Sequence, residues 1–529
     1  MFFPILSLHT GNLLQYLSLL LIGLLMFLLP QEVESFVVVK STARSMMQTE
    51  TKRWNSSKTN IITAVQSTTN QRSHLPNIFT GLYASSIIDV SDDDDNDNDK
   101  NGRIIDNDNN DNNNINGFYW NFLGHSCYAE IVHPTMNEIK ENRNENTNAK
   151  PEILLIHGFA CSTVYWRETR SYLNNAGYTV HSVDLLGQGK SSKPGRNTSQ
   201  DNFGNSNSGS NGGVKYSINL WAQMVDDYSK RYIINCDRNN NNNDKDVDGA
   251  GVVMIGNSLG SVVALSAATG DWYFDNSNNN DDDQQQFKDQ NQRQPPCLPS
   301  KIKGLCFYNI GIGMNSQNLL KTIPTKFVKS IVAIIFDVLN FLIFDNERLL
   351  TFVINEKVSK DVLRTALLSL YSYADNPESQ VDNELVNSFF DPVRNDSTIK
   401  VVEVIRQIYT NDAGKTPMEL HGKYYSSDEV TVEKVANNKN DDNDNGDNDS
   451  SSEITSSLLP IHLIWGEQDI VTPLNGSVGQ FYSKLAEATI TSSSRVDVSI
   501  DIINQAGHVP FDERPECNAY LIQWLNKKV

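Results

Sequence analysis

The chain has 529 residues, a formal net charge of −20 and 20% charged residues. Its acidic residues are concentrated in Asn/Asp tracts, which carry too few apolar side chains to offset the entropy lost on ordering. The negative charge therefore describes solvated insertions and indicates no cationic partner, and the lack of a basic patch excludes a nucleic-acid-binding role.

The first 88 residues have the composition of a targeting sequence. Residues 13–29 form an apolar run that ends at Pro30, with a length between that of a signal-peptide core and that of a short membrane span. Residues 37–88 contain six basic residues and one acidic residue and are rich in Ser and Thr, which is typical of transit peptides. We therefore predict a signal-like segment over residues 1–35 and a transit-peptide-like segment over residues 36–88.

This arrangement resembles the bipartite presequences of algae with secondary plastids, in which a Phe usually opens the second part. Phe36 occupies that position here. The resemblance implies delivery to a plastid (chloroplast) through a secretory-type signal peptide. The alternative is an ordinary signal peptide or signal anchor, which would direct the chain to the endomembrane system or to secretion.

Residues 89–117 are predicted to be a disordered Asn/Asp-rich linker, and residues 118–529 to form one catalytic domain. Residues 118–132 read as a hairpin. Strands are then expected at 153–156, 179–183, 251–255, 304–308, 461–465 and 496–503. Helices are expected at 164–176, with Gly177 as a C-terminal cap, and at 217–234 and 259–269. This alternation predicts an α/β fold with a mostly parallel central sheet flanked by helices.

A helical cap is predicted over about residues 312–422, where helical patterns occur without strands. Within it residues 327–344 are strongly apolar, but Lys329 and Asp337 interrupt the run. A transmembrane helix would hold both charges inside the bilayer, so a cap helix is preferred, with peripheral membrane contact through the apolar cap as a further expectation. Disordered inserts are predicted at about residues 196–213, 236–249, 276–296 and 435–457.

The six cysteines lie far apart, without CxxC pairs or His partners at metal-ligand spacing. In a chain of this length we interpret them as buried free thiols rather than a disulfide framework. We expect no bound metal and no cofactor. The sequence gives no basis for an oligomeric state.

The nucleophile motif is Gly256-Asn257-Ser258-Leu259-Gly260, which follows an apolar strand and precedes a helix. This is the G-x-S-x-G pattern in the strand–turn–helix context that it requires, with Ser258 at the apex of the turn. A serine hydroxyl needs a base to take its proton, and the base needs an orienting carboxylate. Both partners are expected downstream, acid first and histidine second.

Three of the nine histidines follow Ser258, and His508 is the predicted base because it lies just past a strand on a glycine-flanked loop. His462 falls inside a strand and reads as a packed core residue, and His421 has no motif around it. Asp469, immediately beyond a strand, is the predicted acid, with Glu467 as its competitor.

Two strand-end residues upstream of the nucleophile are assigned structural roles. Asp184 is expected to order the loop that contains Gly187 and Gly189, and His157 to hold its own loop through hydrogen bonds. The oxyanion hole is predicted from the backbone N–H groups of Phe159 and Leu259.

With these motifs the chain resembles the α/β-hydrolase superfamily, and more closely its pheophytinase-like branch of plants, algae and cyanobacteria. The matching segments, in addition to those quoted above, are His157-Gly158-Phe159, Asp184-Leu185-Leu186-Gly187-Gln188-Gly189-Lys190-Ser191, Tyr216-Ser217-Ile218-Asn219-Leu220-Trp221, Val404-Ile405-Arg406-Gln407-Ile408-Tyr409 and Asp512-Glu513-Arg514-Pro515-Glu516. Ser261 departs from the branch, which usually has a second glycine there.

The resemblance implies a serine esterase that cleaves the phytyl ester of pheophytin or a related chlorophyll derivative, a step of chlorophyll catabolism. Its partner would be a small hydrophobic ester, and the apolar cap would bury the isoprenoid chain. Two alternatives stay open: a general lipase, carboxylesterase or acyltransferase with the same triad, and a non-catalytic hydrolase-fold binding protein.

Overall fold

The computed structural model describes residues 115–134, 150–195, 213–234, 251–275, 296, 298–371, 373–395, 398–425, 459–490 and 497–529. The predicted signal-like and transit-like segments lie outside these residues, as do all but the last residues of the predicted linker. The predicted inserts also lie outside them, apart from residues at their edges.

An eight-stranded sheet forms the centre of the domain, in the order β1-β2-β4-β3-β5-β6-β7-β8. The predicted hairpin is present as antiparallel β1 (Ile115–Phe122) and β2 (His125–Val132). The other strands run parallel to one another, and β2 joins them antiparallel to β4. They are β3 (Glu152–Ile156), β4 (Val180–Val183), β5 (Val252–Asn257), β6 (Ile302–Tyr308), β7 (Pro460–Gly466) and β8 (Asp497–Ile503).

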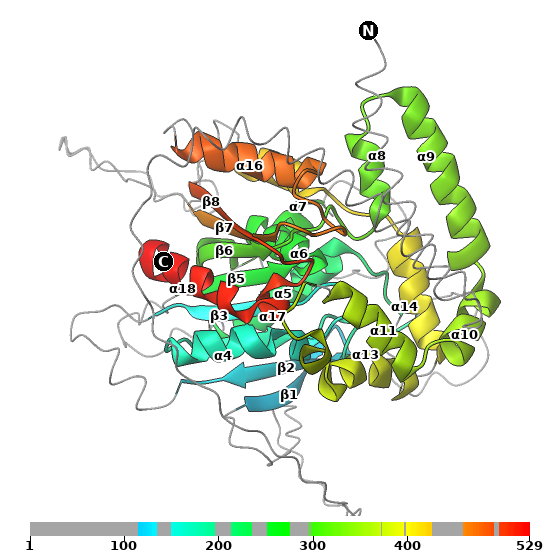
Figure 1. The fold of residues 1–529 in the computed structure, drawn as a ribbon, viewed down its shortest axis with the longest axis horizontal. Coiled ribbons are helices and arrows are strands. Elements are labelled where there is room, and N and C mark those ends of the chain that lie inside the picture. The colour runs from blue at the N-terminus through cyan, green and yellow to red at the C-terminus, as the bar shows by residue number, and fades with distance from the viewer. Residues whose placement is uncertain are drawn as a thin grey trace, which may run out of the picture. The chain divides into compact units, whose positions relative to one another are not determined.

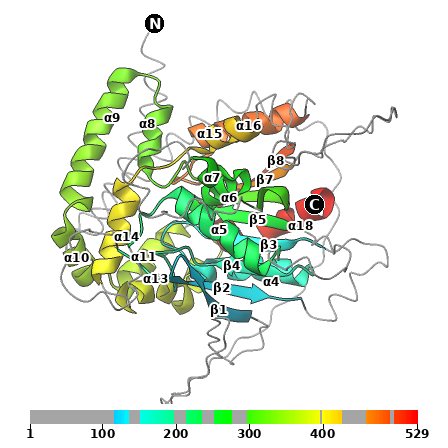
Figure 2. The same cartoon turned by 180° about the vertical axis from the view of Figure 1, so that it is seen from behind.

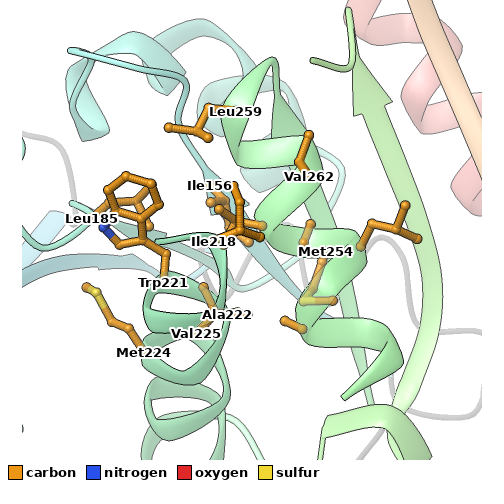
Figure 3. Close-up of a cluster of buried hydrophobic side chains, with 14 of the residues drawn as sticks. Ile156, Leu185, Ile218, Trp221, Ala222, Met224, Val225, Met254, Leu259 and Val262 are labelled. Atoms are coloured by element: carbon orange, nitrogen blue, oxygen red, sulfur yellow. The ribbon is translucent and has the colours of Figure 1, made fainter. Parts of the chain in front are cut away.

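The sheet has a separate hydrophobic core on each face, because successive side chains of a strand point to opposite sides. Ile156 and Met254 pack into one core, with α5 (Ile218–Tyr232), α6 (Leu259–Thr269) and α16 (Ser477–Ile490). Figure 3 shows part of this core, with Trp221 of α5 and Val262 of α6 among its side chains.

The opposite core is formed by the other residues of the same strands. Leu155 and Ile255 pack there with α4 (Arg167–Asn175), α17 (Pro510–Glu513) and α18 (Asn518–Lys528). Strands covered on both faces are expected to be continuously apolar, and all residues of β5 and β7 are buried.

The helical cap is inserted between β6 and β7, and the described residues between these strands form no strand. Most of its helices lie to one side of the sheet, whereas α15 lies beside α16 (Figures 1 and 2). They are α8 (Leu319–Thr322), α9 (Lys326–Leu339) with the π-helical turn η6 (Asn340–Phe344), α10 (Glu347–Glu356), α11 (Lys360–Leu370), α12 (Pro377–Gln380), α13 (Asn383–Asn395), α14 (Thr398–Thr410) and α15 (Pro417–Tyr425).

Most predicted elements are present, with one change of type. The helix predicted at 164–176 begins as a separate 3-10 turn, η1 (Thr163–Trp166), whose first N–H, that of Thr163, donates to the buried Asp184 carboxylate at 2.7 Å. Gly177 follows α4 with φ +83°, as its capping position requires. Cys127, Cys161, Cys306 and Cys517 are free and buried as predicted, whereas Cys236 and Cys297 lie outside the described residues.

Candidate active site

Ser258 occupies the turn between β5 and α6 in a strained backbone conformation, with φ 51° and ψ −115°. The turn is tight because Gly256 and Gly260 have no side chains: a Cβ on Gly260 would lie 2.1 Å from the Ile156 carbonyl oxygen. The Ser258 N–H donates to the Tyr308 carbonyl at 3.0 Å, and its carbonyl accepts from the Gly311 N–H at 3.0 Å. Ser258 itself stays partly exposed at the apex.

The loop after β3 approaches Ser258 closely. A Cβ on Gly158 would lie 3.0 Å from the Asn257 side-chain oxygen and 3.4 Å from the Ser258 Cβ, so the loop and the nucleophile turn are in close contact. Within the described residues, neither the Phe159 N–H nor the Leu259 N–H has an acceptor. The two groups predicted for an oxyanion hole are therefore both available beside the serine.

His157 holds this loop in place, as predicted. Its Nε2 accepts from the Leu185 N–H at 3.0 Å, so its Nδ1 carries the proton and donates to the Gly158 carbonyl at 2.7 Å. Burial lowers the pKa of His157 to about 4, against the opposing effect of the Gly158 bond. A neutral, fully bonded imidazole serves the loop and is not free to act as a base.

Asp184 stabilises the loops that follow β3 and β4. Its carboxylate accepts from the backbone N–H groups of Thr163 and Lys190, each at 2.7 Å, and a Cβ on Gly189 would collide with it. Burial raises the pKa of Asp184 to about 7, although these bonds work in the opposite direction. Gln188, in the same loop as Asp184, also contacts the loop after β3: its side-chain oxygen accepts from the Ala160 N–H at 2.6 Å. The predicted ordering role of Asp184 is confirmed.

His508 and Asp469 form a direct pair, with 2.9 Å between His508 Nδ1 and Asp469 Oδ2. Asp469 is buried and the His508 side chain is only 12% exposed. Glu467, the competing acid, instead accepts a hydrogen bond from the neighbouring Gln468 side chain. The geometry therefore pairs His508 with Asp469.

The Asp469 carboxylate is fully supplied with donors. Its Oδ1 accepts from the N–H groups of Val471 and Thr472 at 2.7 and 3.1 Å, and the Thr472 hydroxyl donates to Oδ2 at 2.6 Å. Burial alone would favour the neutral acid. The charge of His508 and its hydrogen bond, with those from Thr472 and Asn309, outweigh burial and hold the pKa of Asp469 below its usual value. The acid is thus kept ionised beside the imidazole.

Asn309, which the sequence analysis did not identify, links three strand ends. It follows β6 in a left-handed conformation with φ 47°, which Asn tolerates better than most residues. Its side-chain amide donates to Asp469 Oδ2 and to the Gly507 carbonyl, and its side-chain oxygen accepts from the Gly466 N–H at 3.2 Å. The only sequence signal was its place directly after a buried strand.

Ser258 and His508 lie in neighbouring loops at the carboxyl edge of the sheet. The side-chain amide of Asn257 lies 3.2 Å from the Tyr308 carbonyl and 3.3 Å from the His508 carbonyl, which ties the nucleophile turn to the histidine loop. Open α/β sheets place their ligand sites at this edge. The residues predicted from separate motifs are therefore brought together by the fold.

The cap contributes an aromatic wall to the same region. The Tyr409 ring of α14 lies edge-on to Phe159, with ring centroids 5.8 Å apart, and stacks on Phe344 of η6 at 4.0 Å. An apolar surface thus continues from the predicted oxyanion loop to the base of α9.

The histidine loop is also bonded to the cap. Glu513 accepts from the Gly507 N–H with one oxygen and from the cap N–H of Tyr373, at 2.8 Å, with the other. Its neighbour Asp512 accepts from the Tyr371 hydroxyl and pairs with Arg167. The Asp512–Glu516 segment, one of those that carry the resemblance, therefore joins the histidine loop to the cap.

Residues 151–270 match a family model described as alpha/beta hydrolase fold. No curated protein matches the chain in sequence. Similar solved structures include a laboratory-evolved potato epoxide hydrolase (15% identity, 78% of this chain and 99% of that chain, TM-score 0.42). They also include a bromoperoxidase from Bacillus anthracis (12%, 76% and 96%, 0.41) and a serine hydrolase involved in carbazole degradation (15%, 78% and 99%, 0.41).

Proposed function

From the α/β-hydrolase fold of this chain and the residues gathered at its sheet edge, we propose that the protein is a serine hydrolase of carboxylic esters. The observation that carries the proposal is the buried Asp469–His508 pair, at 2.9 Å, in a loop tied to the turn that exposes Ser258. A histidine oriented by an ionised carboxylate is the base that a serine hydroxyl requires.

The reaction proceeds in two acyl-transfer steps. Ser258 Oγ attacks the ester carbonyl while His508 Nε2 takes its proton, and Asp469 stabilises the imidazolium that forms. The carbonyl oxygen gains negative charge and is stabilised by the N–H groups of Phe159 and Leu259. The tetrahedral intermediate collapses with loss of the alcohol, which receives the proton from His508. Water, activated by the same histidine, then releases the acid.

The substrate we propose is the phytyl ester of pheophytin or a related chlorophyll derivative. The resemblance to the pheophytinase-like branch includes the 404–409 segment, and Tyr409 from that segment lies against Phe159 and Phe344. This apolar wall suits a long isoprenoid alcohol. We further propose plastid delivery, on the composition of residues 1–88. A lipase, carboxylesterase or acyltransferase would use the same residues on another ester.

Labelling with a fluorophosphonate probe tests the serine-hydrolase proposal directly. We expect covalent modification at Ser258, found by mass spectrometry of the labelled peptide, and none in Ser258→Ala. A folded wild-type protein that takes up no label would contradict catalysis and favour the binding-protein alternative.

A further inference from the structure

The outer face of α9 is apolar and uncovered. We define it as Phe327, Ile331, Ile334, Val338 and Phe341, whose exposed fractions are 74, 43, 61, 49 and 72%. Their spacing of four and three residues places them in one stripe along the helix. Val332 and Phe336, on the opposite side, are buried.

The whole helical segment Lys326–Phe344 has the composition of a membrane-interacting helix. Its most apolar 18-residue window has a mean hydropathy of 2.2, and 18% of that window is buried. Figures 1 and 2 show α9 at the periphery, away from the sheet, and its main contacts are with the adjoining α8 and η6. An apolar stripe of this length on a protein surface marks an interaction site.

The flanks of the stripe fit lipid better than a partner helix. A coiled-coil seam carries charged residues along both edges, which set the partner and its register. One edge here consists of Val328, Ile335 and Leu342, which are uncharged and at least partly exposed. The apolar surface is therefore broader than a helix–helix seam, as in helices that lie in a membrane interface.

The charges of the segment indicate both the lipid and the orientation. The segment carries two exposed lysines near its start, Lys326 and Lys329, whereas Lys321 of α8 pairs with Glu419. Lys326 lies near the edge of the apolar face, where a lysine fits anionic lipid head groups, and Lys329 lies on the side of Val332 and Phe336. Asp337 is exposed in the middle of the helix and would be costly inside a bilayer. A helix lying parallel to the membrane keeps all of these charges at the surface.

We propose that the outer face of α9 inserts into one leaflet of a membrane containing anionic lipids, with the helix lying in the plane of the interface. The C-terminal end of the segment contacts the aromatic wall, because Phe344 stacks on Tyr409. If the proposed function also holds, this places the site beside the phase in which an isoprenoid ester is dissolved. The docking itself does not depend on that function.

A fluorescence experiment on the full chain tests the docking. Tryptophan is introduced singly as F327W and F341W on α9, and as Y520W on α18, where Tyr520 is also exposed. The tryptophans of the described chain are buried, and wild-type protein gives the background. The vesicles are phosphatidylcholine with and without phosphatidylglycerol, and carry bromine on their acyl chains as a quencher.

We expect severalfold stronger quenching in F327W and F341W than in Y520W, and only with vesicles present. The apolar run at residues 13–29 is common to all variants, so it contributes equally to binding. Replacing Lys326 by Gln should lower the binding constant for phosphatidylglycerol vesicles, measured from α9 quenching, roughly fivefold.

Equal or absent quenching at the three positions would overturn the proposal. An emission spectrum of F341W that is already blue-shifted without vesicles would overturn it too. A concentration-dependent blue shift would assign the outer face of α9 to a second copy of the chain, and a concentration-independent one to another segment of the same chain. Loss of ester hydrolysis with normal quenching would contradict only the proposed function.

Discussion

The side-chain amide of Asn309 donates to the same Asp469 oxygen that receives His508 Nδ1. Because Asn309 also bonds to Gly507, the residue before His508, it fixes both members of the pair relative to β6. We predict that Asn309→Gly, which keeps the left-handed backbone, lowers kcat roughly 10- to 100-fold, the value of one hydrogen bond to a charged group. Asn309→Asp should be worse, since it places a second carboxylate against Asp469.

Steady-state rates across pH separate this positioning role from general instability. Loss of a donor to Asp469 should shift the pH at which kcat/KM is half-maximal and should also lower its maximum. Gln505→Gly is the matched control, because Gln505 also has a positive φ, 54°, but donates nothing to Asp469. If both glycine variants behaved alike, Asn309 would have no positioning role.

The nucleophile and the base should be individually indispensable. Ser258→Ala and His508→Ala are each expected to lower ester turnover by at least about a thousandfold, since members of such a unit fail together. Circular dichroism should show that the domain stays folded, because neither side chain belongs to either hydrophobic core. Near-normal turnover by Ser258→Ala would contradict the mechanism.

The two candidate acids should differ sharply. Asp469→Asn removes the charge that orients His508, and we expect a loss of about 10³- to 10⁴-fold in kcat. Glu467→Gln should change kcat less than about threefold, because its carboxylate bonds to Gln468 and not to His508. A larger loss in Glu467→Gln than in Asp469→Asn would reverse the assignment.

Local signals in the sequence were enough for the strands, the Ser258 turn and α6, whose predicted bounds of 259–269 match the structure. These elements have strong periodicity and a motif with a defined backbone. Asn309 was missed because its function comes from contacts with residues more than 150 positions away, which no local pattern encodes. Thr472 was missed for a different reason: its partner Asp469 is only three residues away, but a hydroxyl shortly after a strand is common in any loop.

The cap was predicted as helical, but its surfaces were not. In α9 both sides of the helix are apolar, so periodicity could not tell the buried Val332 side from the exposed Phe341 side. The link between Tyr409 and Phe159 depends on how α14 returns to the sheet edge after a long insertion. Such packing is decided by tertiary contacts and not by the segment itself.

The N-terminal segments give a prediction that does not depend on the fold. A fluorescent fusion of residues 1–90 should enter the plastid of an alga with a secondary plastid. Phe36→Ala should divert it to the compartment that the signal-like segment reaches alone. Import that is unaffected by the substitution would remove Phe36 from the signal. Retention of an unprocessed fusion in the endoplasmic reticulum would instead indicate a signal anchor.

The substrate is tested by offering the full chain pheophytin, chlorophyll, a triacylglycerol and nitrophenyl butyrate. The pheophytinase-like proposal requires phytol release from pheophytin, with little from chlorophyll if the chain shares the discrimination of that branch. Rapid hydrolysis of butyrate or lipid without phytol release would leave a serine esterase and overturn the subfamily assignment.

Variants of the aromatic wall then show how a large substrate is positioned. Deleting the cap would also strip bonds from Glu513 and the histidine loop, so a single side chain is the better target. Tyr409→Ala removes the ring between Phe159 and Phe344 and should lower kcat/KM for pheophytin about tenfold or more, because remote binding energy aligns a large ester for attack. For butyrate, which needs little beyond Ser258, His508 and the oxyanion donors, kcat/KM should fall less than about threefold.

The control for α14 is Ile399→Ala, which changes an exposed residue on the same helix and should affect the hydrolysis of neither ester. Equal losses on both esters in Tyr409→Ala would mean that the ring supports the Phe159 loop and does not select the substrate.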